Sequence, residues 1–289
     1  MTVATEVLPR PAGPAGPAAP PPGALLLPRR RRRRLGPARP VPFLRALGPL
    51  LLVAAWAAAS AGGALDPRTL PAPWTVLATA GDLLADGRLQ RDLAASLQRA
   101  GTGLVLGVAA GLLLALVAGL SRIGEALVDG PVQVKRAVPA LALVPLAIVW
   151  FGIGEQMKVI VIVLSVLTPV YVNTHAALRG LDARYVELAE TVGLSRGAFV
   201  RRVALPGALP GFLTGLRMAV TVSWLALVVV EQIGATSGIG YLMTQARTYG
   251  QTEVIVVGLV VYGLLGLLGD HAVRAVERRA LSWRRSLGA

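Results

Sequence analysis

The chain of 289 residues contains no cysteine and only two histidines, which limits the chemistry it can perform. Without cysteine it has no disulfide and no thiolate metal site. His175 and His271 are far apart in sequence and lack the spacing of metal ligands. The phosphate-binding motif G-x-x-x-x-G-K-[ST] is also missing, as is a nucleophile with a histidine partner. We therefore expect no cofactor, no metal and no catalytic centre.

Charge is scarce as well. Only 15% of the residues are charged and 54% are hydrophobic, whereas a soluble domain carries about 25% charged residues. Several apolar segments approach the roughly 20 residues that are needed to cross a bilayer. We predict an all-α polytopic membrane protein with about six transmembrane helices, at about 43–64, 102–120, 138–153, 157–174, 211–232 and 253–270.

The first 42 residues differ from the rest. They are rich in proline and alanine, include the run Arg29–Arg34, and show no helical or strand period. We expect a disordered cytoplasmic tail at 1–42, ahead of a transmembrane domain at 43–289. The arginine run either binds anionic lipid headgroups or is a solvated stop that fixes orientation. This uneven distribution of the net charge of +14 argues for a lipid bilayer and against nucleic acid as the partner.

The distribution of basic residues also predicts the orientation. Most Lys and Arg residues lie in the tail, in 121–137, in 180–207 and at the C-terminus. The positive-inside rule then places both termini and the 180–207 loop in the cytoplasm.

The loop itself has a helical pattern. Apolar and charged residues alternate at helical spacing over 181–192, which predicts a short amphipathic helix. Gly193 permits a left-handed turn that ends this helix, and Ser195 is a suitable N-cap for a second, basic helix. We expect Pro206 to end that second helix.

Seven positions in this loop share a spacing with a known motif: Glu187, Leu188, Ala189, Gly193, Val203, Leu205 and Pro206. The loop resembles the cytoplasmic loop of ATP-binding-cassette (ABC) importer permeases, whose pattern is E-A-A, three residues, G, nine residues, I-x-L-P. Leu188 and Val203 are apolar departures from that pattern. The resemblance implies a type I ABC importer permease fold, in which 180–207 is the coupling loop.

The resemblance also implies partners and roles. Two ATPase subunits would bind the loops of two permease subunits, and a homodimer of this chain is favoured. An extracytoplasmic solute-binding protein would deliver the substrate. Glu187 would be a polar contact to the ATPase, Gly193 the turn, and Leu205 with Pro206 the seat of the loop on the fifth span.

Four further stretches extend the resemblance over about residues 90 to 285. They are 138–155, 168–174, 205–220 and 231–242, and they are similar to permeases for nitrate, aliphatic sulfonates and taurine. This implies import of a small nutrient of that kind. The alternatives are an ATP-independent secondary transporter or channel, for which we find no inverted repeat or coupling-ion residues, and a membrane-embedded enzyme.

Charged residues inside a span are functional candidates, because placing one in the bilayer is costly. We expect a translocation path or gate that includes Arg217, Ser223, Trp224, Glu231 and Gln232. The alternative is that Arg217 snorkels to the inner headgroups and Glu231 sits in the outer interface. An anionic substrate would favour a positively charged cavity, whereas the carboxylate deep in the fifth span carries a negative charge. The sequence therefore does not show an anion site.

Two features near the second span leave alternatives open. Leucines recur every four residues over 89–97, which predicts either an interfacial helix or an early start of the span. Gly103, Gly107 and Gly111 form either a face for close helix packing or lipid-facing glycines.

Overall fold

The computed structural model describes residues 44–283 of the chain. The predicted tail at 1–42 and its arginine run therefore lie outside the described residues. Within 44–283 the structure contains helices and no strand, which confirms the all-α prediction. The helices are α1 (Leu44–Ala61), α2 (Pro73–Ala85), α3 (Arg88–Leu120), α4 (Arg122–Ala137), η1 (Ala140–Leu143), α5 (Val144–Phe151), α6 (Glu155–Arg179), α7 (Arg184–Thr191), α8 (Arg196–Phe199), η2 (Val200–Ala204), α9 (Leu205–Glu231), α10 (Ile239–Thr248) and α11 (Thr252–Ala280).

The predicted count of six spans is not confirmed. Among the described residues, four helices are long and apolar enough to cross a membrane: α3, α6, the continuous helix Arg196–Glu231, and α11. A fifth span is possible if α4 and the helix Ala140–Phe151 count as one bent span. The apolar part of α1, Leu47–Ala61, is shorter than these.

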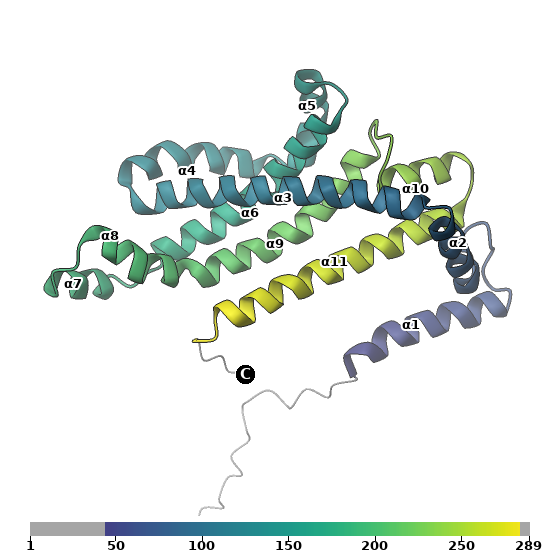
Figure 1. The fold of residues 1–289 in the computed structure, drawn as a ribbon, viewed down its shortest axis with the longest axis horizontal. Helices are drawn as coiled ribbons and strands as arrows, with labels where there is room; N and C mark the ends of the chain where they lie inside the picture. Colours follow the sequence, from purple (N-terminus) through teal and green to yellow (C-terminus); the bar gives the residue numbers. More distant parts are fainter. Residues whose placement is uncertain (1–43, 284–289) are drawn as a thin grey trace, which may run out of the picture. The chain divides into compact units, whose positions relative to one another are not determined.

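The helices α3, α6 and α9 pack side by side (Figure 1), and glycines make the contact between α3 and α6 possible. A Cβ atom at Gly103 would lie 2.4 Å from Ile162 Cγ2, and one at Gly107 would lie 2.7 Å from Val166 Cβ. At Gly111 it would lie 2.7 Å from the backbone oxygen of Leu167. These distances confirm the predicted glycine face, because no larger residue fits without moving α6.

Two segments that we predicted to lie outside the spans, or left open, are regular helix in the structure. The leucine pattern at 89–97 belongs to the first turns of α3, so the early start of the span is the correct alternative. Residues 121–137, which we placed in a cytoplasmic segment between spans, form α4, which packs on α3. Ser121 explains the local fold, since its hydroxyl caps α4 by accepting from Gly124 N at 3.2 Å.

The predicted third span, 138–153, forms the second half of a broken span whose first half is α4. Between α4 and the helix Ala140–Phe151 the chain bends by 87°, and Val138 and Pro139 have extended backbone at the bend. Pro139 favours this because a proline disfavours helical geometry in the residue before it. Gly152, at φ +71°, ends α5 before α6 begins.

Pro206 does not end a helix, which corrects our prediction. The chain is helical without interruption from Arg196 to Glu231. The turn before Pro206 is a π-helical turn, Val200–Ala204, in which Leu205 N donates to Val200 O. Such a turn shifts the backbone register, and Pro206, which has no N–H to donate, follows it directly within the continuous helix.

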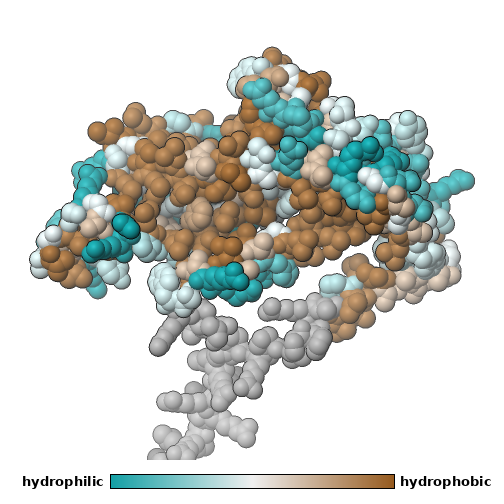
Figure 2. Space-filling model, in the orientation of Figure 1, coloured by the Kyte–Doolittle hydropathy of each residue, from teal (hydrophilic) through white to brown (hydrophobic). Residues whose placement is uncertain are grey.

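Hydrophobic side chains make up both the core and much of the surface. The largest buried cluster includes Val161, Ile162 and Val166 of α6 and Leu227 and Val230 of α9, each fully buried. Figure 2 shows a broad hydrophobic surface over the middle of these helices, with hydrophilic patches towards the α7–α8 end and near α2 and α10. This distribution suits helices that pass through lipid.

The close contact of α3 with α6 leads to a stability prediction. We expect Gly111→Ala to lower the free energy of unfolding by about 1–3 kcal/mol, because the added methyl overlaps the backbone of α6. Gly101→Ala is the matched control on α3, since nothing lies within 4 Å of its Cβ position and alanine favours helix by about 0.5–1 kcal/mol. Thermal unfolding in detergent measures both, and equal melting temperatures would contradict the prediction.

Candidate functional site

The motif loop contains two short helices joined by a left-handed glycine. α7 is followed by Gly193, whose φ is +64°. Ser195 then caps α8, since its hydroxyl accepts from Ala198 N at 3.4 Å. The predicted left-handed turn and N-cap are both confirmed. The sequence placed these elements correctly because both depend only on local backbone geometry.

One face of α7 carries exposed apolar residues. Tyr185 and Leu188 of α7 and Val192, its C-cap, are 54%, 59% and 66% exposed, and their spacing places them on one side of the helix. We call these three residues the loop stripe. Ala189 is 8% exposed and faces the rest of the protein, while Glu187 is exposed. An apolar stripe that is exposed on a polar, basic loop is typical of a surface that binds another protein.

The loop is attached firmly to the helix bundle. Ala204 and Ala208 are buried against Leu178 of α6 in a small core cluster. Arg196 Nη2 donates to the backbone oxygen of Leu120, at the end of α3, over 2.8 Å. The loop therefore contacts the ends of α3, α6 and α9 together.

Three motif residues are not among the buried residues that attach the loop to the bundle. Leu205 is 41% exposed, Pro206 is exposed and Val203 is partly buried. The buried contacts of this turn belong to Ala204 and Ala208. The seat that we assigned to Leu205 and Pro206 stays a prediction, and so does the role of Glu187.

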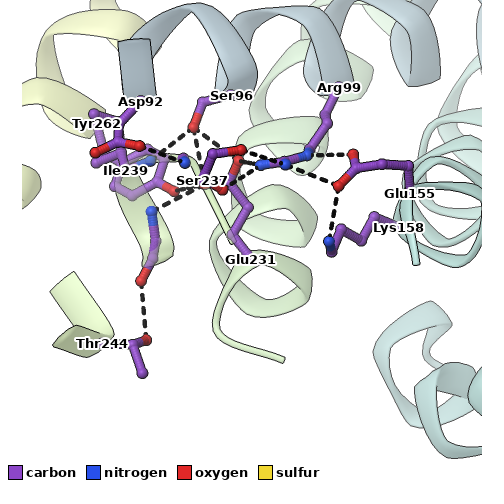
Figure 3. Close-up of polar contacts among 12 residues, drawn as sticks. Asp92, Ser96, Arg99, Glu155, Lys158, Glu231, Ser237, Ile239, Thr244 and Tyr262 are labelled. Atoms are coloured by element: carbon purple, nitrogen blue, oxygen red, sulfur yellow. Dashed lines mark hydrogen bonds and ion pairs between the residues drawn. The ribbon is translucent and has the colours of Figure 1, made fainter. Parts of the chain in front are cut away.

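At the other end of α3 and α9 lies a buried polar cluster, centred on Arg99 (Figure 3). Arg99 Nη1 lies 2.6 Å from Glu231 Oε1, and Arg99 Nε lies 2.6 Å from Glu155 Oε2. Its Nη2 donates to Glu155 Oε1 at 2.9 Å, which makes that pair bidentate. Nη1 also donates to the backbone oxygen of Ser237 at 2.7 Å. One guanidinium thus joins α3, α6, α9 and the segment before α10.

Glu231 is fully enclosed in this cluster. Its side chain is 0% exposed, and both oxygens accept a hydrogen bond. Ser96 Oγ lies 2.8 Å from each oxygen, while Gly240 N and Tyr262 OH each donate to Oε2 at 2.9 Å. The carboxylate is therefore satisfied from α3, α10 and α11 as well as by Arg99.

Two glycines let the backbone reach this carboxylate. Gly238 has φ +114°, and a Cβ there would lie 2.3 Å from Glu231 Oε1. A Cβ at Gly240 would lie 2.6 Å from Glu231 Cβ. Gly238 N also donates to Asp92 Oδ1 at 3.0 Å. These contacts give a physical reason for the glycines in the stretch 231–242.

The cluster has the features of a structural ion-pair network that holds α3, α6 and α9 together, and not those of a reactive centre. Lys158 Nζ lies 2.9 Å from Glu155 Oε1, so each cation of the cluster has a carboxylate partner. Within 44–283 no group of three or more potential metal ligands is present. The gate role that we predicted for Glu231 stays a prediction, although its carboxylate has no exposed surface in this conformation.

The remaining predicted path residues do not gather around Glu231. Ser223 is buried and donates to the backbone oxygen of Val220 at 2.8 Å. Trp224 is partly buried, and its indole nitrogen faces Gly269 of α11. Gln232 is exposed.

Arg217 lies on the side of α9 that faces α11. Its Nη2 lies 2.9 Å from Glu277 and its Nε lies 3.4 Å from Asp270. We did not predict these partners, and we also missed the pairing of Arg99 with Glu231. A signal for the latter was present, because Asp92, Ser96 and Arg99 recur at helical spacing along one face of α3.

The cluster leads to a second prediction. Arg99→Met should lower the free energy of unfolding by about 3–5 kcal/mol, because it leaves a buried carboxylate without its cation. The matched control is Arg217→Met, whose ion pair is 42% and 36% exposed and should contribute less than about 1 kcal/mol. Melting temperatures in detergent measure both. Adding Glu231→Gln to Arg99→Met should recover part of the loss, and no recovery would argue against the pairing.

Comparisons with known proteins agree with this architecture. The chain is 45% identical over 235 residues to a protein of Escherichia coli (strain K12) named for aliphatic sulfonates transport, the permease SsuC, covering 81% of this chain and 89% of that one. It is 34% identical over 238 residues to the taurine transport system permease TauC of the same organism, covering 81% and 86%.

A solved amino acid ABC transporter has a similar fold. It superposes with a TM-score of 0.57 at 21% identity, over 70% of this chain and 96% of that one. The family model for binding-protein-dependent transport system inner membrane components matches residues 103–282, which include α6, the motif loop and α9. The chain therefore belongs to the family of binding-protein-dependent transport system inner membrane components, the permease subunits of ABC importers.

Proposed function

We propose that the chain is the transmembrane subunit of an ATP-driven importer for aliphatic sulfonates. The names of its relatives, which refer to aliphatic sulfonates and to taurine, support this substrate class over nitrate. The family description supports delivery by a solute-binding protein. The sequence lacks a nucleotide-binding motif of its own, so the ATP would be hydrolysed by separate ATPase subunits.

The observation that carries this proposal is the motif loop with its exposed stripe. A helix, a left-handed glycine and a second helix form a rigid projection. The loop stripe, which consists of Tyr185 and Leu188 on α7 and Val192 at its end, is left without a partner within the described chain. Burying this apolar surface in a groove of an ATPase would stabilise the complex. Two copies of the chain would present two such loops to two ATPase subunits.

The attachment of the loop gives a route for mechanical coupling. A displacement of α7 and α8 passes to α9 and α6 through Ala204, Ala208 and Leu178, and to α3 through Arg196. Close-packed elements transmit such shifts as rigid bodies. Closure of the ATPases would then tilt the helices and alternate access to the path.

The orientation follows from the same assignment. The loop must face the cytoplasm to reach an ATPase, and the predicted excess of basic residues on that side agrees. Both termini are then cytoplasmic. The Arg99 cluster, which lies at the opposite end of α3 and α9, is then on the extracytoplasmic side, where a solute-binding protein would dock.

A transport assay tests the function. Proteoliposomes containing the permease, its ATPase subunits and the binding protein should accumulate radiolabelled butanesulfonate only when ATP is supplied. Omission of the ATPase should abolish uptake. Uptake that needs no ATPase and follows a sodium or proton gradient would instead support a secondary transporter.

The loop stripe leads to a third prediction. Leu188→Asp and Val192→Asp should each weaken binding of the ATPase by roughly tenfold or more, because a charge would replace an apolar contact in the interface. The control is Glu190→Gln, which lies on another face of α7. Co-purification with the ATPase and ATPase stimulation measure the effect. Because both side chains are exposed, the melting temperature of the permease alone should not change, and retained co-purification would refute the docking role.

A further inference from the structure

A cavity of about 450 Å³ lies where the broken span meets α6 and α9. Its walls come from three places. The end of α4 and the break contribute Lys135, Arg136 and residues 138–141, α6 contributes residues between Ser165 and Asn173, and α9 contributes Met218, Val222, Leu225 and Ala226. Within a membrane, irregular backbone such as this break is tolerated where it lines a cavity.

Lys135 extends from the end of α4 to the middle of α6. Its Nζ atom donates to the backbone oxygen of Leu164 and to the hydroxyl of Thr168. α6 has 25 residues and is roughly 37 Å long, and these two acceptors lie roughly 14–20 Å from its first residue. The ammonium group is therefore held far from either end of a helix that can span the membrane.

This cation has no carboxylate partner. No described Asp or Glu lies within 4.0 Å of Lys135 or of Arg136, the other cation in the cavity wall. The lining contains no acidic residue at all. By contrast, Arg99, Lys158 and Arg217 each have a carboxylate within that distance. An ionisable side chain at membrane depth is a candidate functional group.

The rest of the lining is suited to an organic anion. Two of the three Lys135 donors are used within the protein, which leaves one for a ligand. Asn173 donates to the backbone oxygen of Pro169 and, at 3.6 Å, to Met218 Sδ, so both of its amide hydrogens have partners within the protein. The opposite wall, formed by Met218, Val222 and Leu225, is apolar.

We propose that this cavity is a binding site for alkanesulfonates on the translocation path, with Lys135 and Arg136 binding the sulfonate and α9 contacting the alkyl chain. The proposal rests on the proposed function and makes its substrate more specific. The site lacks a carboxylate for an ammonium group, so it favours sulfonates with an uncharged chain over taurine. A cation in this cavity would meet two positive charges and no negative one.

The site differs from the residues that we expected on the path. Arg217, Ser223, Trp224, Glu231 and Gln232 do not line the cavity, although their neighbours on α9 do. The cations come instead from the end of α4, a segment that the sequence placed in a cytoplasmic connection. The 87° bend comes directly after these two residues, and the helix that follows it supplies Ala140 and Leu141 to the same cavity.

Binding to the full-length chain in phosphatidylcholine nanodiscs tests the site directly. Equilibrium dialysis with radiolabelled butanesulfonate should give a Kd that is roughly tenfold or more lower than that for taurine. Lys135→Met should weaken butanesulfonate binding roughly tenfold or more, because a charged hydrogen bond is lost. Lys135→Arg should retain binding, and Arg136→Gln should weaken it to a smaller extent.

The controls separate the site from folding and from lipid. Arg247→Gln, an exposed change away from the cavity, should bind like the wild type. Arg136 is exposed, so its variant remains informative if Lys135→Met does not fold. Phosphatidylglycerol should not displace butanesulfonate. If it does, and native mass spectrometry finds that lipid on the wild type but not on Lys135→Met, the cavity binds a lipid headgroup and the proposal is overturned.

The uptake assay distinguishes failure of the site from failure of the function. ATP-driven uptake of butanesulfonate that is unchanged in Lys135→Met, together with unchanged binding, overturns the site and leaves the importer assignment intact. Absence of ATP-driven uptake by the wild type overturns the proposed function, whatever the cavity binds.

Discussion

The fold depends on one buried interaction, the contact of Arg99 with Glu231 and Glu155. A charge in this environment must be paired and hydrogen-bonded, because desolvation alone costs several kcal/mol per ion. The structure meets this demand with groups from five helices and from the loop before α10. Hydrophobic contacts leave helices free to slide between similar packings in lipid, whereas a bidentate ion pair and directed hydrogen bonds define one register. The position of α9 beside α3 is therefore specified at this point.

The buried Arg99 and the partly buried Lys135 have opposite kinds of surroundings. Each N–H group of Arg99 has an acceptor, and these acceptors include two carboxylates, so the cluster has little affinity left for a solute. Lys135 is bonded only to neutral oxygens, and its charge is not neutralised by the protein. The first arrangement gives rigidity and the second gives a site that attracts an anion. Lys135 lies against the middle of α6, an apolar helix long enough to span a membrane, where a cation is costly.

Local features of the sequence predicted the local structure well. Gly193, Ser195 and the glycines of α3 could be interpreted because a left-handed turn, a helix cap and a small face each depend on neighbouring residues or a single period. The failures came from tertiary structure. Pro206 continues a helix because a π turn precedes it. Arg99 falls outside the predicted span 102–120, because its partner Glu231 lies far away in sequence and gives no local signal. The sequence likewise predicts a connection at 121–137, because the amphipathic face of α4 cannot be matched to α3 from local pattern alone.

Loop, cavity and cluster share the same two helices, and this arrangement suggests how they act together. α6 and α9 each contact the motif loop at one end and the Arg99 cluster at the other, with the cavity between. If the cluster holds its end while an ATPase moves the loop, a rigid helix tilts about the cluster. A point midway along the helix then moves about half as far as the loop. The cavity wall formed by α9 would shift relative to Lys135, which is carried by α4 and bonded to α6. A site built at this point can change its affinity with loop position without any change in its own residues.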